Sequence, residues 1–406
     1  MRYSSLIAIG VACVTPVVAE NWQDNCDFPM NEGYSYSFLD NCESHYFAGV
    51  DYLAWYVDQE GMSYASVYDI ASTTATTTAN TADGKDRFFK TQWDSGVRTM
   101  VGFKPCNKSW DIRASYTYFS TNDKPRALSS SATSISTTPP EGGSIVATSG
   151  TVIIPAYFSV REPAAGFAAD EAIITYSILP RWKFNFNQAD LELSEEFFVT
   201  CDATIRFFGG FRGLWTNQKF EEVIALESTF LSDGITTTFG SSAAFEAQHK
   251  FSAFGARAGF DFNYTVGGGL DLYASCAGSI LWGWFNDRQS YAVTTAISGS
   301  TGTEDAAETF THSHHTSILN LDTAFGLRWN YWLNCNRHLL TVRFGWEQHI
   351  YLNINQFQNF ANTPLVGAIG PGSILLGGTQ QPFADHNVQR GDLSLSGFVV
   401  GLQYAF

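Results

Sequence analysis

The sequence predicts an all-β fold, a transmembrane antiparallel β-barrel with an even number of strands. Three observations lead to this fold class. Apolar residues alternate with small or polar residues over long stretches, which gives each predicted strand one apolar face and one polar face. Aromatic residues make up 15% of the chain and charged residues also only 15%, well below the roughly one quarter usual in soluble proteins. The mean hydropathy of -0.08 nevertheless excludes a bundle of membrane helices and suits a barrel with a wet lumen.

The first residues have the pattern of an export signal. Arg2 gives a positive start, an apolar stretch follows over 6–14, and small residues lead to Ala19. We therefore predict a signal peptide over 1–19, an acidic periplasmic segment over 20–44, and a barrel over 45–406. No later apolar run approaches the roughly 18 residues that a spanning helix needs.

Ten strands can be recognised from the alternation, and a further hairpin within 151–180 would make twelve or more. The predicted strands begin near His45, Thr91, Ser109, Ala172, Ala203, Phe245, Leu270, Ser317, Leu339 and Gly391.

The connections between these strands are short and long in turn. Short turns are predicted around 105–108, 200–202, 266–268 and 334–337, and long loops roughly over 58–90, 122–170, 225–244, 289–315 and 355–389. Short periplasmic turns and long extracellular loops are the layout of a barrel in the bacterial outer membrane. A closed ring also satisfies every backbone hydrogen bond in lipid.

The chain ends on a phenylalanine that follows alternating apolar residues. Phe406, Tyr404 and Leu402 share one face of the last strand. This ending resembles the signal that barrel-insertion machinery reads, so we expect that machinery and outer-membrane lipid as partners.

The wet faces of the predicted strands carry many charged residues. Inside a barrel they would hydrate a pore and sort solutes by charge. The alternative is that ion pairs close the interior, because narrow barrels are filled by their own side chains. The predicted pore-lining residues are Arg98, Arg113, Arg206, Arg212, Arg257, Arg328, Arg343, Asp94, Asp111, Asp261, Asp322 and Glu347.

These observations favour a porin for the passive diffusion of small hydrophilic solutes. The alternative is a structural or adhesive surface protein, with Thr- and Ser-rich loops outside and a filled barrel as its membrane anchor. The formal net charge of -16 argues against nucleic acid as a partner. Glu347 and His349 could form an acid–base pair of the kind that enzymes use. A ten-stranded outer-membrane protease would need such a cluster at its outer rim, whereas this pair lies well down a strand. We therefore predict neither an enzyme nor a cofactor.

Six of the seven cysteines lie beyond the signal peptide, and most are predicted at the periplasmic rim, an oxidising location. Two interpretations stay open. One is a disulfide-linked homo-oligomer that supports the envelope, and the other is a single Cys26–Cys42 bond. The disulfide candidates are Cys26, Cys42, Cys106, Cys201 and Cys335.

A short histidine-rich tract, "HSHH" over 312–315, lies at the end of a predicted outer loop. Such tracts bind transition metals in some proteins. A solvated loop end explains it more simply, so no metal site is predicted.

Several stretches resemble a known family. They are "FGARAGFDFNYTVGGGLDLYASCAGSILWGWF" (254–285) and "FGLRWNYWLNCNRHLLTVRFGWEQHIYLNINQF" (325–357), and "RFGWEQH" (343–349) is the most specific part. They are similar to the pore-forming family of the major outer membrane proteins of legionellae and environmental chlamydiae. The resemblance implies a porin-like protein of the outer membrane, whose better-known relatives are cross-linked by disulfides. It supplies no catalytic residues.

Overall fold

The structure is a computed structural model that describes twelve stretches of the chain. They are residues 45–70, 82–89, 92–105, 110–134, 147–155, 171–232, 235–297, 303–333, 338–360, 369–370, 373–374 and 386–406. The predicted signal peptide, the acidic segment and four of the disulfide candidates lie outside them.

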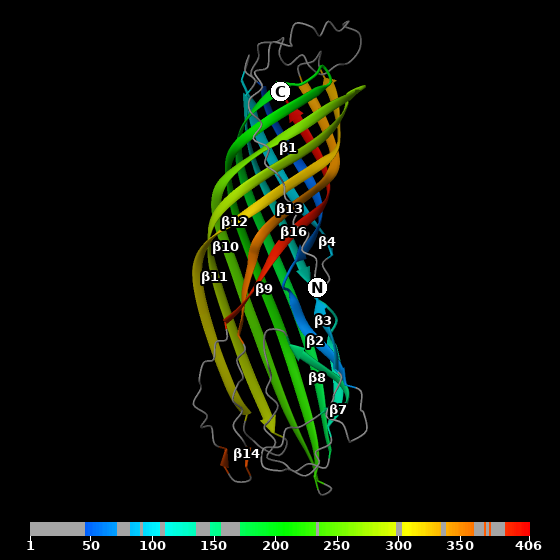
Figure 1. Cartoon of the computed structure of the whole chain (residues 1–406), viewed down its shortest axis with the longest axis vertical. Helices are drawn as coiled ribbons and strands as arrows, with labels where there is room; N and C mark the ends of the chain where they lie inside the picture. Colours follow the sequence, from blue (N-terminus) through cyan, green and yellow to red (C-terminus); the bar gives the residue numbers. More distant parts are fainter. Residues whose placement is uncertain are drawn as a thin grey trace.

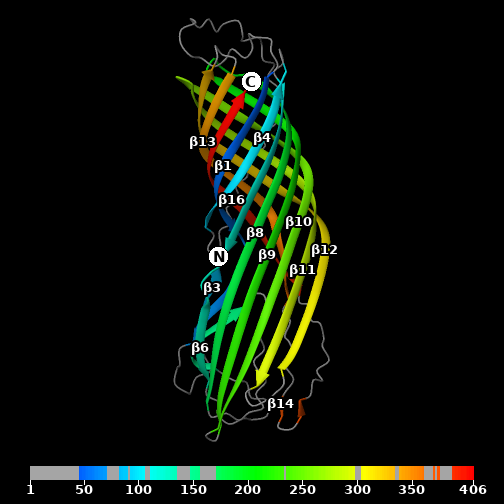
Figure 2. The same cartoon turned by 180° about the vertical axis from the view of Figure 1, so that it is seen from behind.

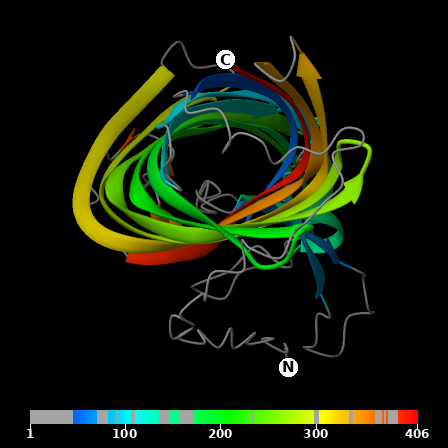
Figure 3. The same ribbon diagram turned by 90° about the horizontal axis from the view of Figure 1, so that it is seen from above.

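Ten strands form a closed antiparallel ring, as the alternation predicts (Figures 1 and 3). Around the ring they are β1 (His45–Gln59), β4 (Trp93–Lys104), β5 (Trp110–Asp123), β8 (Glu171–Phe198), β9 (Ala203–Ser232), β10 (Ile235–Gly267), β11 (Leu270–Ile297), β12 (Thr303–Leu333), β13 (His338–Phe360) and β16 (His386–Ala405). The last strand, β16, pairs with the first, β1, and β8 pairs with β9. The ten strands therefore form a continuous ring of hydrogen-bonded neighbours.

The end of the chain is held by the start of the barrel. β16 pairs with β1 from Phe47↔Ala405 onward, and Tyr46 and Phe406 exchange two backbone hydrogen bonds of 2.9 Å. This pairing satisfies the backbone of the terminal residue next to the membrane, where an unpaired group is costly.

Five neighbouring strands, β8 to β12, are 28 to 33 residues long. A tilted membrane strand needs only about 9 to 11 residues, so these strands continue far beyond the lipid. Four shorter strands join this outer extension: β2 (Ser63–Ile70), β3 (Ala82–Phe88), β6 (Leu128–Ser134) and β7 (Ala147–Pro155). β6 pairs with β8 where β5 has ended, and β7 links β6 to β2 (β2 and β7 are labelled in Figure 1, β6 in Figure 2). A separate small hairpin consists of β14 (Ile369–Gly370) and β15 (Ser373–Ile374).

The outer extension corrects part of the predicted loop pattern. Much of 225–244 and 289–315 is strand, because β10 begins at Ile235 and β12 at Thr303 rather than near Phe245 and Ser317. These Thr- and Ala-rich segments could not fold alone. Here they extend hairpins whose strand register is already set by the part inside the membrane. The hairpin suggested within 151–180 does not enter the ring, which keeps ten strands.

The outward face of the ring is an apolar band bordered by aromatic residues. Tyr46, Tyr331 and Phe406 are exposed at the end with the short turns, and Trp215 and Trp282 at the other. Such aromatic girdles mark the two membrane interfaces.

Beyond Trp215 the outward face becomes charged. Lys219 forms ion pairs with Glu221 at 2.6 Å and with Glu246 at 3.1 Å. This part of β9 and β10 therefore lies outside the membrane-spanning segment. Among the described residues, no helix is long and apolar enough to cross a membrane.

Candidate functional site

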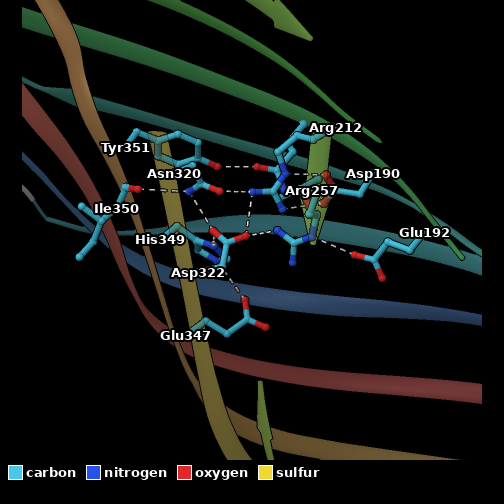
Figure 4. A network of polar contacts seen from close by, with 12 residues as sticks. Asp190, Glu192, Arg212, Arg257, Asn320, Asp322, Glu347, His349, Ile350 and Tyr351 are labelled. Atoms are coloured by element: carbon cyan, nitrogen blue, oxygen red, sulfur yellow. Dashed lines mark hydrogen bonds and ion pairs between the residues drawn. The ribbon is translucent and has the colours of Figure 1, made fainter. Parts of the chain in front are cut away.

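The inner face of the ring holds a network of charged side chains at the height of the membrane (Figure 4). Its centre is Asp322 on β12, which is only 5% exposed. One carboxylate oxygen accepts a hydrogen bond of 2.7 Å from Arg212 and contacts Arg257. The other lies 2.8 Å from Nδ1 of His349 and accepts a hydrogen bond from Asn320. The carboxylate of Asp322 on β12 thus connects side chains of β9, β10 and β13.

The network continues from Asp322 to the wall formed by β8. Arg212 donates two hydrogen bonds to Asp190, at 2.6 and 3.0 Å, and Arg257 donates one of 3.0 Å to Glu192. Arg212 is 1% exposed, so a full positive charge is buried here and needs these carboxylates.

A second branch connects β4 and β13. Arg98 donates hydrogen bonds of 2.9 and 2.7 Å to the two oxygens of Glu347, which lies 3.4 Å from His349. Asp51 is 3.6 Å from Arg98 and also pairs with Arg343. This branch joins the ion pairs of β1, β4 and β13 to the network around Asp322.

The half of the lumen nearer the short turns is richer in arginine. Arg206 bonds Asp111 at 2.9 and 3.1 Å and Asp261 at 2.7 Å. Arg328 donates only to the amide of Asn263, and Arg113 lies over the ring of Phe47. Among the described residues neither Arg113 nor Arg328 forms an ion pair. The buried carboxylate of Asp271, which lies opposite Arg328 in the β11–β12 ladder, forms none within the described part of the chain either.

Most of the residues predicted on the inner face therefore belong to one of these ion-pair groups. Asp94 lies apart from them, near the other end of β4, where it contacts Thr121.

A layer of buried aromatic residues lies on the same inner face, farther from the short turns. Trp55 packs on Phe119 at 5.5 Å and on Phe186 at 6.3 Å between ring centroids, and Phe251 stacks on Phe285 at 4.2 Å. All five are at most 1% exposed. Within the described residues the interior at this height is a packed core.

The alternation in single strands could have revealed this layer. In β8, Leu191 and Leu193 face outward, whereas Trp182, Phe184 and Phe186 face inward. The apolar side changes from odd to even positions because the strand leaves the lipid between them. Sequence analysis assigned one wet face to the whole strand and so missed the aromatic layer.

The cysteines are only partly described. Cys201 is disulfide-bonded, and its partner lies outside the described residues. Cys26, Cys42, Cys106 and Cys335 also lie outside them, so their pairing stays a prediction. Cys276 is a free thiol within β11.

The histidine tract lies within β12 rather than at the end of a loop. His314 stacks on Phe285 and contacts Gln356, while His315 meets the edge of Trp284. These side chains have separate partners. In the described part of the chain no three His, Cys, Asp or Glu residues are placed to hold a metal ion.

Comparison with known proteins gives distant structures and one family. No functionally curated protein matches the chain. The outer membrane protease OmpT from Escherichia coli is 6% identical, with 89% of this chain and 96% of that chain covered and a TM-score of 0.32. A FadL homologue of Pseudomonas aeruginosa is 10% identical, with 89% and 90% covered and a TM-score of 0.20. Neither likeness supports an inference about this chain.

The family profile covers almost all of the barrel and the strands of the outer extension. It is described as the Legionella pneumophila major outer membrane protein precursor and matches residues 43–406. This match confirms the resemblance found in the sequence and the location in the bacterial outer membrane. The chain therefore belongs to the Legionella major outer membrane protein family.

Proposed function

We propose that this protein is an outer-membrane channel for small hydrophilic solutes, and that the described conformation is its narrow resting state. The observation that carries the proposal is the charged network around Asp322, Arg212 and Glu347, at the height of the membrane. A buried ion pair often stabilises a protein no more than well-packed apolar residues of similar volume would. A barrel that only anchored a surface domain would gain little from such a network, whereas a channel needs a polar lumen.

The arrangement also suggests how solutes would be sorted. Arg113 and Arg328 lie in the half of the lumen nearer the short turns and have no ion pair among the described residues. Guanidinium groups that no ion pair holds remain able to bind anions and repel cations in a low-dielectric passage. The proposed channel therefore favours small anions over small cations.

A second function is favoured by a different observation, the packed aromatic layer around Trp55, Phe186 and Phe251. A filled barrel would serve as the anchor of a structural or adhesive surface protein, whose exposed part is the outer extension. The disulfide at Cys201 is compatible with a cross-linked envelope scaffold in either case. Non-reducing gels of native envelopes test that scaffold, since only monomer would exclude it.

Single-channel conductance separates the two functions. Purified protein that is shown to be folded by its heat-dependent mobility on gels is added to a planar bilayer with a salt gradient. Discrete, long-lived steps with an anion-selective reversal potential support the channel. Silence from folded protein supports the anchor.

A further inference from the structure

Three polar side chains line the inner wall of β9 where it passes the aromatic layer. Thr216, Gln218 and Glu222 point inward and are 3%, 0% and 0% exposed. The inward residue between Gln218 and Glu222 is Phe220, which is also buried. The polar groups thus follow one wall of a core that is otherwise largely apolar.

The neighbours of these side chains across the sheet are mostly aromatic. Thr216 is paired with Phe186 on β8 and with Phe251 on β10. Glu222 is paired with Pro180 and Phe245 on the same two strands.

The polar atoms of these side chains lack hydrogen bonds to the described part of the protein. They are the hydroxyl of Thr216, the amide oxygen and nitrogen of Gln218, and both carboxyl oxygens of Glu222. The indole nitrogen of Trp182, on the adjacent strand β8, is also buried without a hydrogen bond to the described part of the protein. Buried polar groups are nearly always satisfied by protein or by ordered water, so a row of them in one wall indicates water.

We propose that Thr216, Gln218 and Glu222 mark a hydrated path along β9, which water and small uncharged polar solutes follow through the aromatic layer. This inference rests on the proposed channel function and gives it a route. The path runs beside one wall rather than along the axis of the barrel.

The two ends of this row meet regions that suit such a path. Toward the short turns, the next inward residue after Thr216 is Leu214, which is paired with Gln188 on β8. The one after that is Arg212, which belongs to the charged network. At the other end, Glu222 lies beyond the lipid, next to the outward pair Lys219–Glu221.

The side chains of the row can form hydrogen bonds with uncharged polar solutes. Burial raises the pKa of Glu222 to about 8, so its carboxyl is protonated at neutral pH and both donates and accepts hydrogen bonds. A hydroxyl, an amide and a neutral carboxyl satisfy a polyol or a short sugar.

Thiol labelling tests the path directly. Single cysteines are introduced as Thr216→Cys, Gln218→Cys and Glu222→Cys, with Leu393→Cys and Leu395→Cys as controls at buried core positions of β16, on the opposite side of the ring. All five variants carry Cys276→Ser, and folded protein is treated with methyl methanethiosulfonate, a small uncharged reagent. We expect the three polar positions to react at least ten times faster than the two controls. Equal slow labelling at all five overturns the path, because the wall is then dry. Equal fast labelling also overturns it, because water then fills the whole lumen.

A transport measurement separates failure of the path from failure of the channel. Liposome swelling in arabinose is compared for the parent protein, Thr216→Val with Gln218→Leu, and the control Leu395→Val on β16. We expect the double variant to swell at least three times more slowly and the control to match the parent. Swelling that the double variant leaves unchanged overturns the route but keeps the channel. Fast labelling without swelling or conductance overturns the channel and leaves a hydrated wall that conducts nothing.

Discussion

Tyr351 on β13 donates a hydrogen bond of 2.5 Å to the side-chain oxygen of Gln188 on β8. Four strands separate the two on either side of the ring, β9 to β12 one way and β5, β4, β1 and β16 the other. The bond therefore crosses the lumen between opposite walls. Gln188 also donates to Asp190, so the crossing contact is part of the charged network.

Removing this bond is expected to widen the channel. Tyr351→Phe keeps the ring but leaves the Gln188 oxygen without the tyrosine hydroxyl, at a cost of about 1 kcal/mol in folding stability. We expect a higher single-channel conductance or a larger open fraction in planar bilayers. Tyr331→Phe, on the lipid-facing side, is the control and should match the parent. An unchanged conductance in Tyr351→Phe would show that the bond does not limit the passage.

The pair Arg98–Glu347 is expected to be strongly coupled. Arg98→Ala leaves Glu347 buried without its bidentate partner, which costs about 3 to 5 kcal/mol in folding stability. The double variant Arg98→Ala with Glu347→Ala should lose less than the sum of the two single variants, because no buried charge is left unpaired. Urea unfolding in lipid vesicles measures the three variants. Additive losses would mean that the two side chains do not stabilise each other.

The unpaired arginines are expected to set the charge preference. Arg113→Gln with Arg328→Gln removes the two arginine charges near the short turns that form no ion pair within the described residues. The reversal potential in a salt gradient should shift toward cation selectivity. Lys219→Gln, on the outward face beyond the lipid, should leave it close to the parent value. Identical reversal potentials in all three proteins would exclude Arg113 and Arg328 as the source of selectivity.

Glu222 is expected to make the folding stability fall as the pH rises. Its pKa is raised to about 8 by burial, against about 4.5 in an unfolded chain, so the folded state binds the proton more tightly. The stabilisation is complete below about pH 4.5, decreases between pH 4.5 and 8, and is lost above pH 8. The unfolding temperature on heat-modifiability gels, followed from pH 4 to 9, should show this decrease. Glu222→Gln should flatten it, and a slope that persists in this variant would assign it to another group.

The ring could be predicted from sequence because every strand that crosses the membrane needs an apolar side facing the lipid. The alternation from Phe254 to Tyr264, or from Leu319 to Trp329, specifies which side faces lipid wherever lipid is present. The ten strands and their lipid-facing sides followed from that single period.

The outer extension and the packed interior could not be predicted in the same way. Where the strand is surrounded by water its outward side must be polar and its inward side can be apolar. Trp182 and Phe184 are therefore buried inside, while Lys183 faces out. The low apolar content of 225–244 concealed strand pairing that depends on the hairpin below it. Contacts such as Tyr351 to Gln188 join residues 163 positions apart, and only closure of the ring brings them together.

The change of apolar side along β8 also determines how deeply the barrel is inserted. Sliding the protein toward the periplasm would place Lys219 and Glu221 in hydrocarbon, and sliding it outward would expose Phe211 and Trp215 to water. Both displacements are costly, so a thinner or thicker bilayer must deform to match the barrel rather than shift it. The vertical position of this protein is thus encoded within single strands, independently of the loops and turns that connect them.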